Sequence, residues 1–218
     1  MAENSISEAG IPEAGADIAG RIAARALAKR EAVYATEVRK LLDAALLVIQ
    51  RRGTDSRPRV ADIVAAAGLS NDAFYRHFSS KDALVEALME EGTERLFSYL
   101  DRRMSRRSAP AERVREWVEG VLSQGVGEVA ANTRAVMWNA GGLAQGLVTG
   151  PAPANARLAT LLHEPFAELG CAEPESDALL AAHATVGALS DALWHRVDPT
   201  PADIDRVTAF CLRAAGCG

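Results

Sequence analysis

Aromatic residues and cysteine are scarce in this chain. Aromatic side chains make up only 5% of the 218 residues, whereas Ala and Leu dominate. Such a composition favours helices over sheets. The three cysteines, Cys171, Cys211 and Cys217, are odd in number and include no Cys-x-x-Cys pair. We therefore expect ordinary thiols in a reducing cytoplasm and no disulfide framework.

Long apolar runs are also missing. No stretch approaches the ~18 consecutive apolar residues of a membrane span. The sequence opens with Met-Ala-Glu-Asn-Ser, and no basic segment followed by an apolar run comes after it, as a signal peptide would require. We expect a soluble, cytoplasmic chain without a membrane partner.

Catalytic and metal-binding motifs are absent as well. His163 and Glu164 lack the second histidine of a zinc helix, and His183, His195 and Cys171 show no ligand spacing. The sequence contains no Gly-x-Ser-x-Gly, no phosphate-binding loop and no dinucleotide fingerprint. The chain is therefore predicted to be no enzyme and to need no metal or cofactor.

Charge is distributed unevenly. The whole chain has 24 Lys and Arg against 29 Asp and Glu, a net charge of −5. Residues 17–81 hold 12 basic and 7 acidic side chains, or +5, whereas residues 82–218 hold 12 and 19, or −7. A basic module attached to an acidic body is typical of a nucleic-acid binder. Chance clustering of surface charge is the alternative.

Residues 59–81 read as two short helices joined by a tight turn. Gly68 can end the first helix, and Ser70 is a good N-cap for a second helix that starts at Asn71. Apolar residues recur at helical spacing on one side of the pair, namely Val60, Ile63, Val64, Ala67, Phe74 and Phe78. Asn71, Asp72, Ala73, Tyr75, Arg76 and His77 are left to point outward. This pattern predicts a DNA-reading helix-turn-helix.

The same residues carry a family resemblance. Ala-Ala-Ala-Gly-Leu-Ser, followed by Phe-Tyr-Arg-His-Phe-Ser-Ser-Lys-Asp-Ala-Leu, resembles the DNA-binding signature of the TetR (tetracycline-repressor) family of bacterial regulators. The resemblance covers residues 35–89, and its pieces lie at the right mutual spacing. Beyond that stretch the chain resembles the family only in being long and helical.

The resemblance implies which residues contact DNA. Tyr75, His77 and Lys81 would meet phosphates, while base readers would lie at Asn71, Asp72 and Ala73. Arg76 also can meet phosphates, and Asn71 can pair bidentately with adenine. Asp72, Arg59 and Ala61 depart from the usual family pattern. The predicted DNA-contacting set is Arg59, Ser70, Asn71, Asp72, Ala73, Tyr75, Arg76, His77 and Lys81; surface solvation is the alternative for each.

The remaining sequence predicts an all-α fold. Further helices are expected at residues 81–105 (capped by Ser80), 111–126, from 132 (capped by Asn132), 155–169 (kinked by Pro165), 174–196 and 201–215. The predicted domains are an N-terminal extension at 1–30, the helix-turn-helix domain at 31–80, and a ligand-binding and dimerisation domain at 81–218.

The N-terminal extension has two interpretations. Residues 1–16 are expected to be disordered, and a helical pattern begins at Asp17. Basic residues surround its apolar positions, namely Arg21, Arg25, Lys29 and Arg30. The segment is either a basic arm that adds DNA contacts or a solvated helix packed on its own subunit. It either breaks or runs on into a helix at residues 37–52.

A small-molecule pocket is expected in the acidic body. Candidate residues mix apolar, aromatic and amide side chains, a mixture that lines ligand pockets: Trp117, Val121, Gln124, Met137, Trp138, Asn139 and Phe166. Ordinary core packing is the alternative for each residue. The pocket is implied by the family resemblance, and the small-molecule effector is expected to be largely apolar.

Helices 174–196 and 201–215 are the candidate dimer interface. The first has a surface of small residues on which another helix can lie close, and in the family these two helices pair as a four-helix bundle. The resemblance thus implies a homodimer on a palindromic double-stranded DNA operator. The alternatives are packing within one chain, a ligand-independent architectural DNA-binding protein, or a protein-binding module that keeps only the fold.

Overall fold

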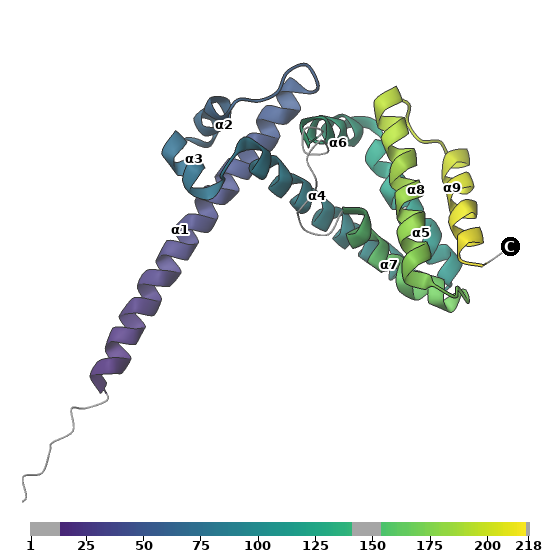
Figure 1. The fold of residues 1–218 in the computed structure, drawn as a ribbon, viewed down its shortest axis with the longest axis horizontal. Helices are drawn as coiled ribbons and strands as arrows, with labels where there is room; N and C mark the ends of the chain where they lie inside the picture. Colours follow the sequence, from purple (N-terminus) through teal and green to yellow (C-terminus); the bar gives the residue numbers. More distant parts are fainter. Residues whose placement is uncertain (1–13, 141–153, 217–218) are drawn as a thin grey trace, which may run out of the picture. The chain divides into compact units, whose positions relative to one another are not determined.

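The structure, a computed structural model, describes residues 14–140 and 154–216. Within these two stretches every regular element is a helix and no strand occurs (Figure 1), which confirms the predicted all-α fold. The elements are α1 (Ala14–Arg52), α2 (Val60–Ala67), α3 (Asn71–His77), α4 (Lys81–Met104), α5 (Pro110–Leu122), the 3-10 turn η1 (Ser123–Gly125), α6 (Gly127–Ala140), α7 (Ala154–Glu168), α8 (Pro174–His195) and α9 (Pro201–Ala214). None of the described helices is long and apolar enough to cross a membrane.

The chain divides into two compact units at Lys40 and Leu41. Helix α1 begins in the first unit and ends in the second, which contains α2 to α9. The predicted domain limits at residues 30 and 80 stay predictions.

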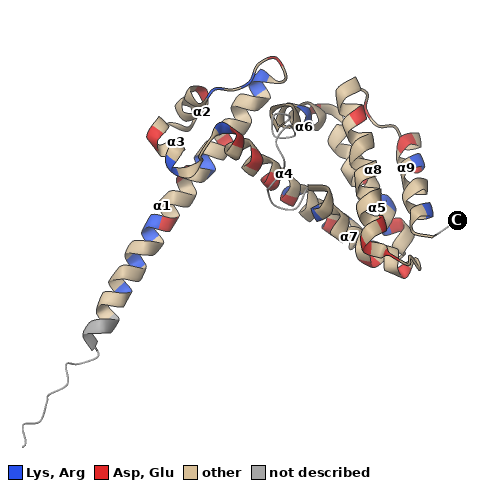
Figure 2. Cartoon of the chain, viewed as in Figure 1, with Lys and Arg blue, Asp and Glu red and all other residues tan. Residues whose placement is uncertain are grey.

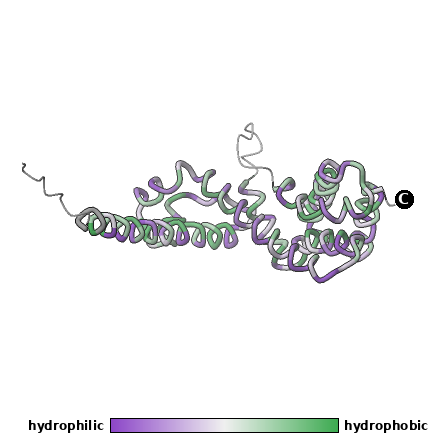
Figure 3. The backbone as a smooth tube through the Cα atoms, turned by 90° about the horizontal axis from the view of Figure 1, so that it is seen from below, coloured by the Kyte–Doolittle hydropathy of each residue, from purple (hydrophilic) through white to green (hydrophobic). Residues whose placement is uncertain are grey.

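A single hydrophobic core holds the body together. Trp117, Phe166, Leu100, Leu162 and Leu193 are among its fully or almost fully buried members. They come from α4, α5, α7 and α8, and α7 packs most extensively against α8, while α9 packs on α5 and α8. Figure 3 shows hydrophobic and hydrophilic residues interspersed along the helical backbone.

The start of α1 and the end of α5 differ from those expected. Helix α1 starts at Ala14, before Asp17, and runs without a break to Arg52. Its sequence contains no proline, and its two glycines, Gly15 and Gly20, both lie near its start. Residues 1–13 of the expected disordered segment lie outside the described residues. Helix α5 ends at Leu122, where η1 begins, so the expected helix to residue 126 is too long.

Asn132 does not cap a helix. Val126 is extended (φ −113°, ψ 134°), which lets α6 begin directly at Gly127. Asn132 consequently lies inside α6. Pro165 lies inside α7, and the kink expected there stays a prediction.

Candidate functional site

The turn between α2 and α3 is built from short-range hydrogen bonds. Gly68 adopts the left-handed conformation (φ 64°, ψ 35°), which glycine reaches without a Cβ penalty. The Leu69 amide then donates to the Val64 carbonyl at 3.0 Å. Ser70 Oγ accepts from the Ala73 amide at 3.1 Å and caps α3. The expected helix-turn-helix is therefore present.

Aromatic packing fixes which side of α3 faces outward. Phe74 is fully buried and Phe78 almost so. The Phe74 ring stands edge-on to Tyr75, with 5.2 Å between centroids, and lies 5.9 Å from Phe78. These contacts leave Asn71, Asp72, Tyr75 and Arg76 exposed, with His77 and Lys81 partly exposed.

Two residues of the predicted DNA-contacting set, Ala73 and Ser70, make contacts within the helix-turn-helix itself. The Ala73 side chain is only 4% exposed, so the expectation that it points outward is wrong. Ala73 and Phe74 are adjacent on the buried arc of α3, because neighbouring helical residues lie only about 100° apart. The Ser70 hydroxyl is engaged in the cap.

Arg59 lies at the N-cap of α2 with its side chain exposed. Its backbone amide donates to Asp62 Oδ2 at 3.1 Å, and Arg52 Nη2 forms an ion pair with the same oxygen at 2.8 Å. The last turn of α1 is thereby tied to the first turn of α2. Asp62 is not among the predicted site residues, although an acidic residue at the third helical position is a recognisable capping signal.

A cavity of about 440 Å³ lies in the body. Its walls come from α1, α4, α5, η1, α6, α7 and α8. Apolar side chains predominate, including Leu46, Leu88, Leu96, Val136, Leu158 and Leu189, and the polar groups include Gln50, Gln124, Asn132, Thr133 and Asn155. Glu91 and Arg95, the two charged lining residues, form an ion pair with each other. The lining described therefore carries no net formal charge.

The cavity gathers three of the seven predicted pocket residues, Val121, Gln124 and Met137. Trp117 and Phe166 are fully buried in the core, and Trp117 Nε1 donates to the carbonyl of the cavity residue Leu158 at 3.0 Å. Trp117 therefore supports the cavity wall at Leu158, whereas Phe166 is a residue of the hydrophobic core.

Trp138 and Asn139 also lie outside the described lining. Trp138 is 41% exposed and stands edge-on to Trp194, with 6.1 Å between ring centroids. Asn139 is buried, and its Nδ2 donates to the Ala135 carbonyl at 2.9 Å. Leu46 and Gln50 line the cavity but are not among the predicted pocket residues, because in the sequence they are ordinary positions of a supporting helix.

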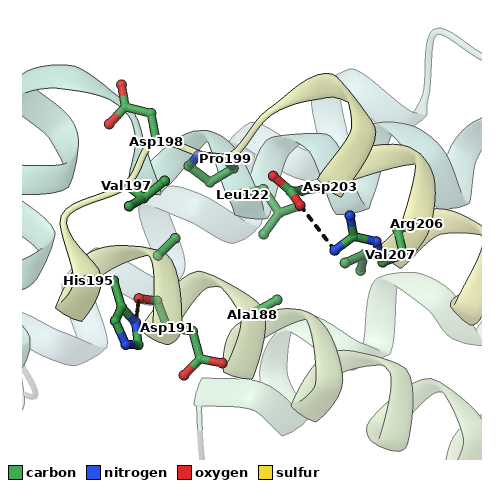
Figure 4. Close-up of a pocket in the computed structure, with 11 residues that line it drawn as sticks. Leu122, Ala188, Asp191, His195, Val197, Asp198, Pro199, Asp203, Arg206 and Val207 are labelled. Atoms are coloured by element: carbon green, nitrogen blue, oxygen red, sulfur yellow. Dashed lines mark hydrogen bonds and ion pairs between the residues drawn. The ribbon is translucent and has the colours of Figure 1, made fainter.

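A second, smaller cavity of about 310 Å³ lies between the end of α8 and the start of α9. Figure 4 shows Asp191, His195, Asp198, Asp203 and Arg206 around it, with Arg206 paired to Asp203 and the His195 ring bonded to the Asp191 carbonyl. The described residues hold no cluster of three or more His, Cys, Asp or Glu side chains arranged to bind a metal ion. The acidic groups here are therefore dispersed and do not converge on one point.

The surroundings of two thiols raise their pKa values. Burial raises the pKa of the Cys211 thiol. Burial, reinforced by a hydrogen bond to Asp177 at 3.0 Å, raises the pKa of the Cys171 thiol. Since the thiolate is the nucleophilic form, neither group is activated for chemistry. Cys217 lies outside the described residues.

The helix-turn-helix segment matches known proteins in sequence. Residues 41–88 match the family described as bacterial regulatory proteins, tetR family. Over 51 residues the chain is 45% identical to the HTH-type transcriptional regulator YvdT of Bacillus subtilis (strain 168), a match that covers 23% of this chain and 26% of that protein. The matched part thus spans about a quarter of that relative's length.

Solved structures extend the likeness of fold over most of the chain. A TetR-family transcriptional regulator from Mesorhizobium loti MAFF303099 has a TM-score of 0.59 at 15% identity, covering 84% of this chain and 96% of that one. The reduced form of Escherichia coli NemR has a TM-score of 0.54 at 16% identity, covering 80% and 95%. The sequence signature, the geometry of α2 and α3 and the match of residues 41–88 together show that this segment is a DNA-binding domain of the TetR family of bacterial transcriptional regulators.

Proposed function

We propose that this chain is a homodimeric, ligand-responsive repressor that binds a palindromic operator and releases it when a small molecule enters the body. One observation carries the proposal. We call the helix-turn-helix, residues 59–80, the reading unit. Helix α4 begins at Lys81, directly after the reading unit, and lines the 440 Å³ cavity with residues from Leu88 to Leu96. A single helix therefore connects the residues proposed to contact DNA with the cavity.

DNA recognition would come from the outer face of α3. Asn71, at its start, has the amide that pairs bidentately with adenine in a major groove. Tyr75, Arg76, His77 and Lys81 would contact phosphates and set the orientation of the helix. Asp72 is exposed and would either accept from cytosine or turn away from the backbone. Arg59, exposed at the start of α2, is a further phosphate contact in this proposal.

Dimerisation would use the outer faces of α8 and α9. Leu180, Ala184, Gly187 and Trp194 lie at helical spacings on one exposed stripe of α8. Leu180 is 62% exposed, Trp194 46% and Phe210 of α9 46%. Large exposed apolar side chains grouped with small ones mark an interaction surface. A two-fold axis through this surface would present two α3 helices to the two halves of a palindrome.

The effector would be a neutral, largely apolar molecule with a few hydrogen-bonding groups. The cavity volume of about 440 Å³ lies in the range of small-ligand sites. The Glu91–Arg95 ion pair cancels charge in its wall, so a strongly charged ligand would lack a counter-charge. Gln124, Asn132 and Asn155 would orient the polar groups of the ligand.

Release follows from differential binding. An effector dissociates the operator complex only to the extent that it binds the DNA-free arrangement more tightly. Cavity residues from α1 and α4, such as Gln50 and Leu96, belong to helices that also border the reading unit. A ligand that holds these helices in a different arrangement would change the separation of the two α3 helices.

Footprinting on DNA flanking the gene tests this function. We expect one protected palindrome, with half-sites about one helical turn, ~34 Å, apart or somewhat more. A His77→Ala and Lys81→Ala double variant should bind every sequence more weakly, while Arg102→Ala, an exposed change in the body, should not. Uniform, salt-sensitive coating by the unchanged protein would support an architectural DNA-binding protein instead.

The cavity is tested separately with a variant that fills it. Gly92 lines the cavity, and a Cβ at this position meets nothing within 4 Å. Gly92→Leu should still bind the operator. Substrates and products of the enzymes encoded by neighbouring genes should no longer raise its melting temperature or release it from DNA. An undiminished response in Gly92→Leu would place the effector elsewhere.

A further inference from the structure

The N-terminal half of α1 is a long exposed helix with an unusual charge. Every residue from 18 to 36 is exposed. Residues 21–30 contain four Lys and Arg, namely Arg21, Arg25, Lys29 and Arg30, and no Asp or Glu. Figure 2 shows the basic residues spaced along this part of α1. The matched family segment starts only at residue 41, so this charge lies outside the recognised DNA-binding domain.

Helical geometry places most of these cations on one face. Arg21, Arg25 and Lys29 follow each other at four-residue intervals, and each is turned about 40° from the one before and raised about 6 Å along the axis. Arg39 comes 18 residues after Arg21, which is five full turns, so it lies in the same direction. Lys40 falls about 20° from Lys29. We call Arg21, Arg25, Lys29, Arg39 and Lys40 the basic ridge.

The ridge is about 27 Å long from Arg21 to Arg39. Its intervening positions are small or short, since Ala28, Ala32 and Thr36 lie on the same face. A rod-shaped polyanion could therefore approach the helix closely. Duplex DNA carries a phosphate charge for every ~1.7 Å of its axis, so a ridge of this length can meet several phosphates at once.

We infer that the basic ridge binds the phosphate backbone of duplex DNA and adds sequence-independent affinity to that of the helix-turn-helix. Charge complementarity carries this inference, and the ridge lies on the same helix as the start of the DNA-binding domain. Phosphate contacts position a protein but do not read sequence. The ridge therefore raises affinity for operator and unrelated DNA by the same factor.

The test replaces the three ridge residues outside the family segment that are closest to one another. The variant is Arg21→Gln, Arg25→Gln and Lys29→Gln, because glutamine keeps helix propensity while it removes charge. The matched control is Arg102→Gln, Arg106→Gln and Arg213→Gln, which removes the same charge from exposed positions of the body. Far-UV circular dichroism checks that both variants keep the helix content of the unchanged protein.

The measurement is DNA affinity as a function of salt, on operator and on unrelated duplex. Three lost phosphate contacts should lower the slope of log K against log salt by about 3 per chain. Raising the salt concentration from 50 mM to 200 mM weakens DNA binding by a certain factor. In the ridge variant this factor should be smaller by roughly 40-fold per chain. Equal loss on both duplexes, with the control unchanged, supports the ridge.

Two results would overturn the inference. One is a ridge variant whose affinity and salt slope equal those of the control variant. The other is unchanged DNA binding combined with lost binding to vesicles of anionic phospholipid, which would make the ridge a membrane-surface contact. Both differ from failure of the proposed repressor function, in which the unchanged protein would protect no palindrome.

Discussion

The reading unit and the cavity-bearing body are both helical, but different kinds of contact hold them. In the reading unit and at its borders, Ser70 accepts from the Ala73 amide and Ser80 from the Ala83 amide, each three residues apart, and the Arg52–Asp62 ion pair spans ten positions. In the body, Trp117 bonds to Leu158 across 41 positions, and Arg157 bonds to Glu94 across 63. The structure of the reading unit is thus set mainly by contacts between residues close in sequence, and that of the body by contacts between residues far apart in sequence.

This difference explains why the sequence matches and the structural matches cover different parts. A local code requires particular residues at particular spacings, and residues 41–88 match a family in sequence. A body built on long-range packing needs only compatible volumes and apolar faces. Solved structures with TM-scores of 0.59 and 0.54 accordingly share only 15% and 16% of their residues with this chain.

The largest expected effect comes from removing a long-range contact at the centre of the body. Trp117 is fully buried and bonded to the Leu158 carbonyl. Trp117→Ala should lower the free energy of unfolding by about 3–5 kcal/mol, measured by urea denaturation. Trp117→Phe, which keeps a ring but loses the N–H donor, should cost less. A loss below about 1 kcal/mol in Trp117→Ala would contradict the long-range account of the body.

Two glycines test the long-range account of the body, because the same change to alanine should destabilise the protein at one of them and stabilise it at the other. A Cβ on Gly120 would lie 2.4 Å from Leu100 Cδ2, since α4 and α5 approach closely there, whereas a Cβ on Gly92 meets nothing within 4 Å. Gly120→Ala should destabilise by about 1–3 kcal/mol, and Gly92→Ala should stabilise by up to about 1 kcal/mol through helix propensity. Thermal unfolding of both variants measures the difference. Equal shifts would show that the packing at Gly120 adapts freely.

The contrast between local and long-range contacts also explains which features could be predicted from the sequence. The turn at Gly68 and the cap at Ser70 follow from residue type and position, and the structure has them where they were expected. The burial of Ala73 did not follow, because a small residue carries no periodic signal of its own. A good N-cap residue does not by itself predict the start of a helix, since Asn132 lies inside α6.

The cavity could be predicted only in part. Val121, Gln124 and Met137 line it, as their mixed chemistry suggested. Trp117 and Phe166 looked equally suitable, yet the helix crossings bury them in the core. Leu46 and Gln50 look unremarkable on α1, and they reach the cavity only because several helices converge there. Which residues line a cavity depends on those crossings, and no local pattern specifies them.

An ion-pair network between α4 and α5 should give the body a distinct pH dependence. Glu116 accepts from Arg103 Nε at 2.7 Å and from Arg107 Nε at 2.9 Å. Burial raises the pKa of Glu116, but the bonds from Arg107 and Arg103 outweigh it and hold the pKa below its ordinary value of 4.5. The folded protein therefore binds fewer protons here than the unfolded chain does. The stabilisation is complete above about pH 4.5 and is lost as the pH falls through the lower, folded value.

Glu116→Gln should cost about 1–2 kcal/mol at pH 7. Urea denaturation between pH 7 and pH 3 should show that the variant loses less stability on acidification than the unchanged protein. Glu86→Gln, an exposed change on α4, is the control and should follow the unchanged protein. Parallel curves for the Glu116 variant and the unchanged protein would mean that this network contributes no pH dependence.

The smallest expected effect separates the cap from DNA contact at Ser70. Ser70→Ala removes the acceptor for the Ala73 amide and should destabilise by about 1 kcal/mol. Ser70→Asp keeps a capping oxygen, so thermal stability should stay near that of the unchanged protein, but its charge should repel phosphate and weaken operator binding. Ser80→Asp repeats the exchange at the cap of α4. If Ser70→Asp bound the operator as tightly as the unchanged protein, Ser70 would only cap α3 and would not contact DNA.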